Sequence, residues 1–171
     1  ASPANIARAA RLVDELRPIG GTAIGDALAA ALSLGGRARP EVARPFMVIF
    51  LTDGLPTVGE TREEALVAQV RKTGSPARVF CFGIGTDVNT HLLDRISEQT
   101  RGASQYVLPT EDIEVKVSRF YTRIREPVLS DISLAFTNAG IRITQVLPKE
   151  LPDLFNGDML VVFGRYSGAG H

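Results

Sequence analysis

The chain has 171 residues, of which 44% are hydrophobic and 22% charged, and its 19 basic residues are balanced by 19 acidic ones. This composition is typical of one globular domain, and the lack of net charge argues against a nucleic-acid or anionic-lipid partner gathered by a global field. No apolar stretch approaches the roughly 20 residues that a membrane helix needs. The single cysteine, Cys81, excludes an intrachain disulfide and is expected to be an inert core residue.

Helical periodicity predicts five helices. The first is the amphipathic stretch ASPANIARAARLVDEL, a helix rather than a signal peptide, with Ser2 as N-cap and Pro18 after its end. A second helix is expected from about Ala23 to the pair Gly35-Gly36, followed by a polar connection over Arg37–Pro45. The remaining three are expected from Arg62 with the capping box Thr61 and Glu64, over Asn89–Thr100, and from the cap Thr110 to Ile124.

Short apolar runs predict the strands. Phe46–Thr52 and Arg78–Ile84 are typical of strands buried on both faces of a parallel sheet, so we expect them to be adjacent and joined by the helix from Arg62. Gln105–Leu108 predicts a shorter strand. After Pro127, the segments VLSDISLAF, IRITQVL and DMLVVFGRY predict two or three antiparallel strands. The chain is thus divided into an α/β unit over residues 1–126 and a β-strand appendage over residues 127–171.

Oxygen-bearing side chains lie where the predicted strands end. Thr22 follows two glycines at a helix start, Thr52 and Asp53 end one strand, and Asp87 follows the next strand in GIGTD. Ligands bind at the carboxyl ends of strands in such sheets, and hydroxyl and carboxylate oxygens suit a hard cation such as Mg²⁺. Simpler alternatives stay open, since Thr22 can cap the helix that follows it and Asp53 can form a turn with Gly54.

Motifs for catalysis are weak. The stretch GGTAIG (20–25) is close to a dinucleotide-binding fingerprint, but Thr22 replaces the middle glycine, and a helix rather than a strand precedes the stretch, so this motif is excluded. A P-loop is excluded as well, because Asp26 stands where that motif requires a lysine. A nucleophilic triad needs a base, and the histidines are His91, expected on the surface, and the terminal His171. Leu51, two residues before Asp53, excludes the carboxylate pair of a haloacid-dehalogenase-type phosphotransferase.

Three stretches together resemble a von Willebrand factor A domain: GGT-x-I-x-x-AL (20–28), FLTDGLPTVGET (50–61) and VFCFGIGTDVNTHLLDRIS (79–97). The variant is similar to that of the inter-α-trypsin inhibitor heavy chains. The later stretch PVLSDISLAF…LPDLFNGDMLVVFGRY also resembles the segment that follows the A domain in those proteins. This likeness implies a Rossmann-like, doubly wound parallel sheet with a metal-ion-dependent adhesion site. There, Mg²⁺ or Mn²⁺ is held by a D-x-S-x-S loop, by a threonine matched by Thr22 and by an aspartate matched by Asp53. The metal would accept a carboxylate from a protein ligand.

The chain departs from this family in one respect. It contains no D-x-S-x-S motif, and the nearest match, Asp131-Ile-Ser133, lies in the appendage. The resemblance therefore implies the C-terminal part of a larger protein, with the first strand missing and Mg²⁺ binding weak or absent. An unpaired edge at Phe46–Thr52 predicts association, either with a second copy or with the missing N-terminal part.

The function expected from these observations is a metal-assisted protein-binding or adhesion module, without catalysis, in an exported or cell-surface protein. Two alternatives remain open. One is a subunit of an intracellular, chelatase-like enzyme complex, and the other is a structural scaffold without a metal site.

Overall fold

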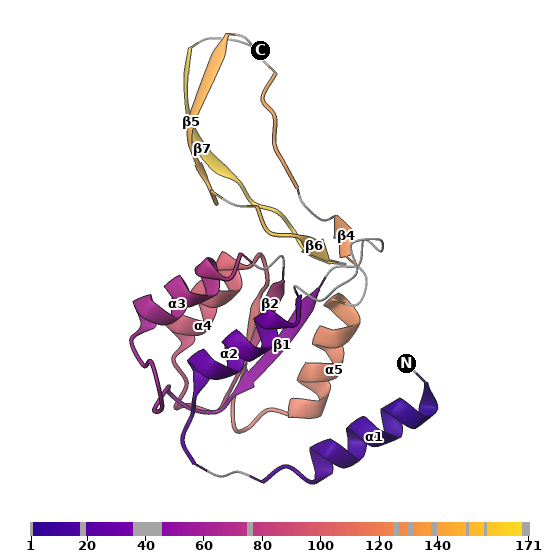
Figure 1. The fold of residues 1–171 in the computed structure, drawn as a ribbon. Coiled ribbons are helices and arrows are strands. Elements are labelled where there is room, and N and C mark those ends of the chain that lie inside the picture. Colours follow the sequence, from indigo (N-terminus) through magenta and orange to yellow (C-terminus); the bar gives the residue numbers. More distant parts are fainter. Residues whose placement is uncertain are drawn as a thin grey trace.

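The structure is a computed structural model of the 171-residue chain, and it describes residues 2–17, 20–35, 46–74, 77–124, 127–129, 132–137, 140–149, 151–155 and 157–168. Its centre is a parallel sheet in the order β1-β2-β3, formed by Met47–Thr52, Arg78–Ile84 and Ser104–Val107 (Figure 1). The predicted parallel pairing of the first two strands is confirmed. The third strand begins one residue earlier than predicted.

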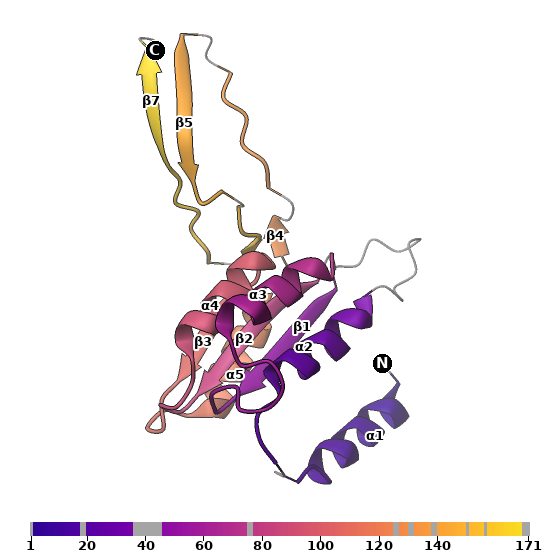
Figure 2. The ribbon, with the colours of Figure 1, turned by 60° about the vertical axis from the view of Figure 1, so that its left-hand side comes forward.

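Three helices cover one face of this sheet: α2 (Ile24–Ser33), α3 (Glu63–Lys72) and α4 (Thr90–Gln99) (Figure 2). In each helix the apolar residues recur at three- and four-residue intervals, so one stripe of side chains is buried. These stripes pack against Val48 of β1 and against Val79 and Cys81 of β2.

The helix α5 (Ile113–Ile124) lies on the opposite face of the sheet. The Phe120 ring packs edge-to-face on the rings of Phe80 and Phe82, with centroid distances of 5.5 and 4.6 Å. Since successive residues of a strand point to opposite faces, β2 contributes to two cores, and Phe80 and Cys81 are both completely buried. Helices on both faces of a parallel sheet confirm the predicted Rossmann-like α/β class.

The strand β1 lies at the edge of the sheet and is covered on one face only. Val48 and Thr52 are buried, whereas Ile49 and Leu51 are 42% and 50% exposed. The prediction that this strand is buried on both faces was wrong, because the buried side chains of α5 pack mainly on Phe80 and Phe82 of β2, and β1 adds the half-buried Met47 at the margin of this cluster.

The first helix, α1 (Pro3–Asp14), lies apart from the sheet in both ribbon views. It begins as predicted, with the Ser2 hydroxyl accepting a hydrogen bond from the Asn5 backbone N–H at 3.3 Å. None of its residues is buried, although its amphipathic pattern predicts a contact face. The apolar side chains left exposed are Ile6, Leu12, Val13 and the following Leu16.

The start of α3 differs from the prediction. Arg62 is its N-cap residue without a side-chain cap, and the predicted capping box of Thr61 and Glu64 is wrong. The reason is local competition, because the Glu60 carboxylate accepts the Arg62 backbone N–H at 2.9 Å and also binds the Arg62 guanidinium.

The start of α5 differs as well. The Asp112 carboxylate accepts the Val115 N–H at 3.1 Å, so Asp112 rather than Thr110 is the cap. The intervening Glu111 accepts the Leu108 N–H at 2.9 Å, which fixes the turn before the helix.

The appendage follows α5 and forms two antiparallel pairs. β4 (Pro127–Leu129) pairs with β6 (Leu154–Phe155) next to the α/β unit, and β5 (Ile141–Leu147) pairs with β7 (Phe163–Gly168) in a ribbon that projects away from it (Figure 1). The predicted antiparallel strands are confirmed, but β6 was missed, and residues 132–136 of VLSDISLAF are not a strand.

Several predictions fall outside the described residues, namely those for Pro18, Gly36, Arg37–Pro45, Asp131 and His171. Among the helices that the structure describes, none combines the length and apolar character needed to cross a lipid bilayer.

Candidate functional site

The carboxyl ends of β1 and β2 carry the candidate site. Asp53 directly follows β1, and Asp87 lies in the bend after β2, so both carboxylates are at the same edge of the sheet. Thr22 lies in the segment before α2. This edge is where parallel α/β sheets bind their ligands.

The backbone of Thr22 is fixed to the loop that follows Asp53. The Thr22 N–H donates to the Thr57 hydroxyl at 2.8 Å, and the Thr22 carbonyl accepts the N–H groups of Thr57 at 2.9 Å and Val58 at 3.2 Å. A Cβ on Gly21 would lie 2.6 Å from the Thr57 hydroxyl oxygen, so a glycine is required for this approach. The two loops are therefore joined by backbone hydrogen bonds.

The Thr22 hydroxyl lies close to the residue after Asp53. A Cβ placed on Gly54 would be 3.3 Å from the Thr22 hydroxyl oxygen. The helix α2 begins at Ile24 with Ala23 as its N-cap residue and without a side-chain cap. The alternative that Thr22 caps this helix is therefore wrong, and the hydroxyl has no role in starting α2.

The Asp53 carboxylate is exposed and makes no hydrogen bond or ion pair with any residue that the structure describes. The turn after β1 is formed by Thr52, whose hydroxyl donates to the Gly54 carbonyl at 3.1 Å and accepts its N–H at 3.4 Å. The alternative that Asp53 serves this turn is therefore wrong. Asp53 therefore presents an exposed carboxylate, one residue before Gly54, that makes no contact serving the fold among the described residues.

These residues fit a divalent-cation site in donor type but not in number. Hydroxyl and carboxylate oxygens are the ligands of Mg²⁺, which takes about six of them in octahedral geometry. Within the described ranges, no group of three or more histidine, cysteine or acidic side chains is placed to hold a metal ion. Thr22 and Asp53 can supply part of a coordination shell, and the remaining positions would have to come from water or other donors.

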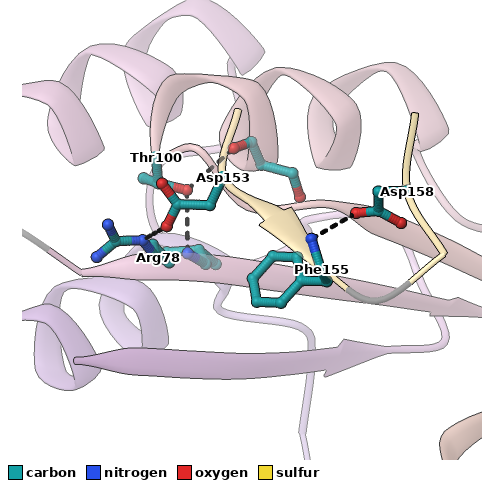
Figure 3. Close-up of polar contacts among 7 residues, drawn as sticks. Arg78, Thr100, Asp153, Phe155 and Asp158 are labelled. Atoms are coloured by element: carbon teal, nitrogen blue, oxygen red, sulfur yellow. Dashed lines mark hydrogen bonds and ion pairs between the residues drawn. The ribbon is translucent and has the colours of Figure 1, made fainter. Parts of the chain in front are cut away.

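At the opposite end of β2, a buried ion pair joins the appendage to the α/β unit. Arg78, the first residue of β2, donates from Nε to the Asp153 carboxylate (Figure 3). The side chains of this pair are 10% and 1% exposed. Sequence reasoning missed the pair because its members are 75 residues apart, and a single acidic residue in LPDLF does not indicate its partner.

Phe155 and Asp158 extend this contact. The Phe155 ring packs edge-to-face on Phe80 with a centroid distance of 5.6 Å. The backbone N–H of Phe155 donates to the Asp158 carboxylate at 3.1 Å (Figure 3). Asp158 also pairs with Arg123 of α5 at 2.6 Å. We call residues 151–155, 157 and 158 the anchor segment, because they bind both β2 and α5.

Two further predictions concern single side chains. Cys81 is completely buried, and burial raises the pKa of its thiol to about 11, as expected for an inert core residue. His91 is on the surface as predicted, with Nδ1 2.7 Å from the Glu63 carboxylate. Glu63 also binds Arg95 at 2.7 Å, and hydrogen bonds from Arg95 and His91 lower the pKa of the Glu63 carboxyl group.

Comparison with known proteins agrees with the fold. The model of the von Willebrand factor type A domain matches residues 1–106, so the chain belongs to this family. The chain is 29% identical to mouse inter-alpha-trypsin inhibitor heavy chain H2 over 173 residues, 97% of this chain and 18% of that protein. It is 30% identical to human heavy chain H4 over 176 residues, 99% of this chain and 19% of that protein.

The similarity to the heavy chains extends through the appendage, whereas the family model ends at residue 106. The A domain of this chain is thus of the inter-α-trypsin inhibitor heavy-chain type. The chain spans less than a fifth of these relatives, at 18% and 19% of their lengths. The domain boundary at residue 126 stays a prediction.

Proposed function

We propose that this chain is the protein-binding module of a larger von Willebrand factor A protein, with a partial metal-ion-dependent adhesion site and no catalytic activity. The observation that carries the proposal is the approach of the Thr22 hydroxyl to Gly54, the residue that directly follows Asp53. The unused Asp53 carboxylate and the similarity to inter-alpha-trypsin inhibitor heavy chains support it.

The partner in this proposal is a protein that offers a carboxylate. A bound Mg²⁺ or Mn²⁺ supplies an open position for such a ligand when the coordination shell is completed by further oxygens. In this chain, Thr57 orients the Thr22 loop, and Asp53 contributes negative charge at the same edge of the sheet. The likeness to the heavy chains also favours an exported or cell-surface parent protein.

A scaffold without a metal site is the second candidate, and the small number of donors favours it. The chelatase-like alternative has no observation of its own in its favour. Because two protein oxygens leave most of an octahedral shell to water, we expect Mg²⁺ to bind this chain weakly at best, with a dissociation constant of about a millimolar or more.

The test is Mn²⁺ titration of the ¹⁵N-labelled chain, followed by paramagnetic broadening of amide signals. We expect broadening centred on residues 22 and 53–54, and loss of that broadening in Asp53→Asn. The matched control is Asp14→Asn, which removes an aspartate from α1 and should leave the broadening unchanged. Broadening that is scattered over the acidic surface and indifferent to Asp53→Asn would reject the partial metal site and leave the scaffold.

A further inference from the structure

An open groove lies at the end of the α/β unit opposite to Thr22 and Asp53. One part has a volume of about 900 Å³ and is lined by Arg71 of α3, Gln99 of α4, Arg101 and Lys149. A second part, of about 500 Å³, shares Arg101 and Lys149 and continues along the appendage. Both volumes are in the range of about 300–1,000 Å³ that ligand sites occupy.

The first part of the groove is basic. Arg71 donates to the Gln99 side-chain oxygen at 3.1 and 2.7 Å, and since this amide is neutral, the guanidinium charge is not compensated there. Lys149 is exposed and makes no hydrogen bond or ion pair with the described residues. Arg95 also lines the groove but is paired with Glu63, and Glu98 is the one acidic residue among its described lining.

A role in stabilising a helix end explains the position of Arg71 but not that of Lys149. Arg71 lies in the last turn of α3, where a cation stabilises the negative end of the helix dipole. Lys149 belongs to the segment after β5 and stabilises no helix end in this way. Two elements far apart in the sequence therefore direct positive charge into the same groove.

The second part of the groove has a mixed lining, in which apolar side chains lie next to Arg101, Ser133 and Lys149. Leu134 and Phe136 line it together with Val146, and the first two side chains are 46% and 54% exposed. Apolar side chains that line an open groove beside the exposed Lys149 indicate a binding surface more than a packing defect.

From this juxtaposition we propose that the groove binds a peptide segment of a partner protein in which acidic residues are followed by apolar ones. The acidic residues face Arg71 and Lys149, and the apolar residues face Leu134 and Phe136. A sulfated polysaccharide matches the basic side chains but leaves Leu134 and Phe136 without a partner, so the mixed lining favours a peptide. The groove and the proposed metal site lie at opposite ends of β2. A strand of seven residues is about 20 Å long, so the two sites are separate.

The experiment is fluorescence anisotropy of the full chain with a labelled synthetic peptide in which a run of glutamates precedes leucines and phenylalanines. We expect Lys149→Glu to weaken binding about tenfold, or about 1.4 kcal/mol, since charge reversal replaces an attraction at this exposed contact by a repulsion. Arg71→Gln should weaken it several-fold, and added salt should do the same for the unaltered chain. The control Arg8→Glu, on the exposed helix α1, should have no effect.

Two peptide controls and one polymer complete the test. Replacing the glutamates by glutamines, or the apolar residues by serines, should each reduce binding at least several-fold. Equal binding of either control peptide overturns the proposal. If a sulfated polysaccharide binds through Lys149 and the peptide does not bind, the proposal is also overturned, because the partner then belongs to a different class. Chelation of divalent metal should leave peptide binding unchanged, which separates this result from the proposed function.

Discussion

Replacing Asp153 by alanine would leave the Arg78 guanidinium inside the protein without its carboxylate. The two side chains are 10% and 1% exposed, so water cannot easily replace the missing oxygen atoms. Breaking a buried ion pair by removing one partner costs about 3–5 kcal/mol, which is a large part of the roughly 5–15 kcal/mol that stabilises a typical domain. We expect Asp153→Ala to lower the free energy of unfolding by about 3–5 kcal/mol.

Two further variants test the cause of this loss. Asp158→Ala removes the partner of Arg123, from a pair whose side chains are 41% and 15% exposed, and the acceptor of the Phe155 N–H. It should cost only about 1–2 kcal/mol because water reaches this pair. The double variant Arg78→Met with Asp153→Leu removes both charges and keeps apolar volume. It should recover most of the stability lost in Asp153→Ala.

The assay is urea unfolding followed by far-ultraviolet circular dichroism, since the chain contains no tryptophan. Amide exchange at Phe155 shows whether the anchor segment detaches before the whole chain unfolds. Similar losses of about 1–2 kcal/mol in Asp153→Ala and Asp158→Ala would refute the reasoning. So would a double variant that is no more stable than Asp153→Ala.

The remaining predictions concern a thiol, a glycine and a strand edge. Because burial raises the pKa of Cys81 from 9.0 to about 11, the unfolded thiol ionises first, and stability should fall as the pH rises through this interval in denaturation experiments. Gly102→Ala would set a Cβ 1.9 Å from the Val79 carbonyl oxygen and should cost about 3 kcal/mol in thermal unfolding, whereas Gly164→Ala has room at 3.5 Å and should be nearly neutral. Residues 46–52 should mediate a dimer or larger species by light scattering, and a stable monomer with slow amide exchange along residues 47–51 would contradict this.

The parts of the fold that could be predicted depend on local patterns. The buried stripes of α2 and α4 and the apolar run of β2 follow from side-chain periodicity, because each element must bury one or both faces. The burial of β1 could not be obtained in this way. Its sequence is as apolar as that of β2, but its exposure depends on which neighbours the rest of the chain supplies.

The candidate site divides in the same way. The order of strand, Thr52 and Asp53 is local, and it predicted an acidic group at the carboxyl end of β1. The caps of α3 and α5 were wrong because several polar side chains compete for the same N–H groups within a few residues. The pair of Arg78 and Asp153 depends on a contact across 75 residues, which no periodicity reveals.

The anchor segment has a mechanical consequence. A module attached by one stretch of chain can swivel freely, but the appendage is attached twice, by the chain that leaves α5 and by Asp153 and Phe155 on β2. Since β4 and β6 pair with each other, the two attachments lie side by side, and rotation of the ribbon is restricted to a hinge about one line. A partner that pulls on β5 and β7 would thus transmit force through Asp153 to Arg78, the first residue of β2.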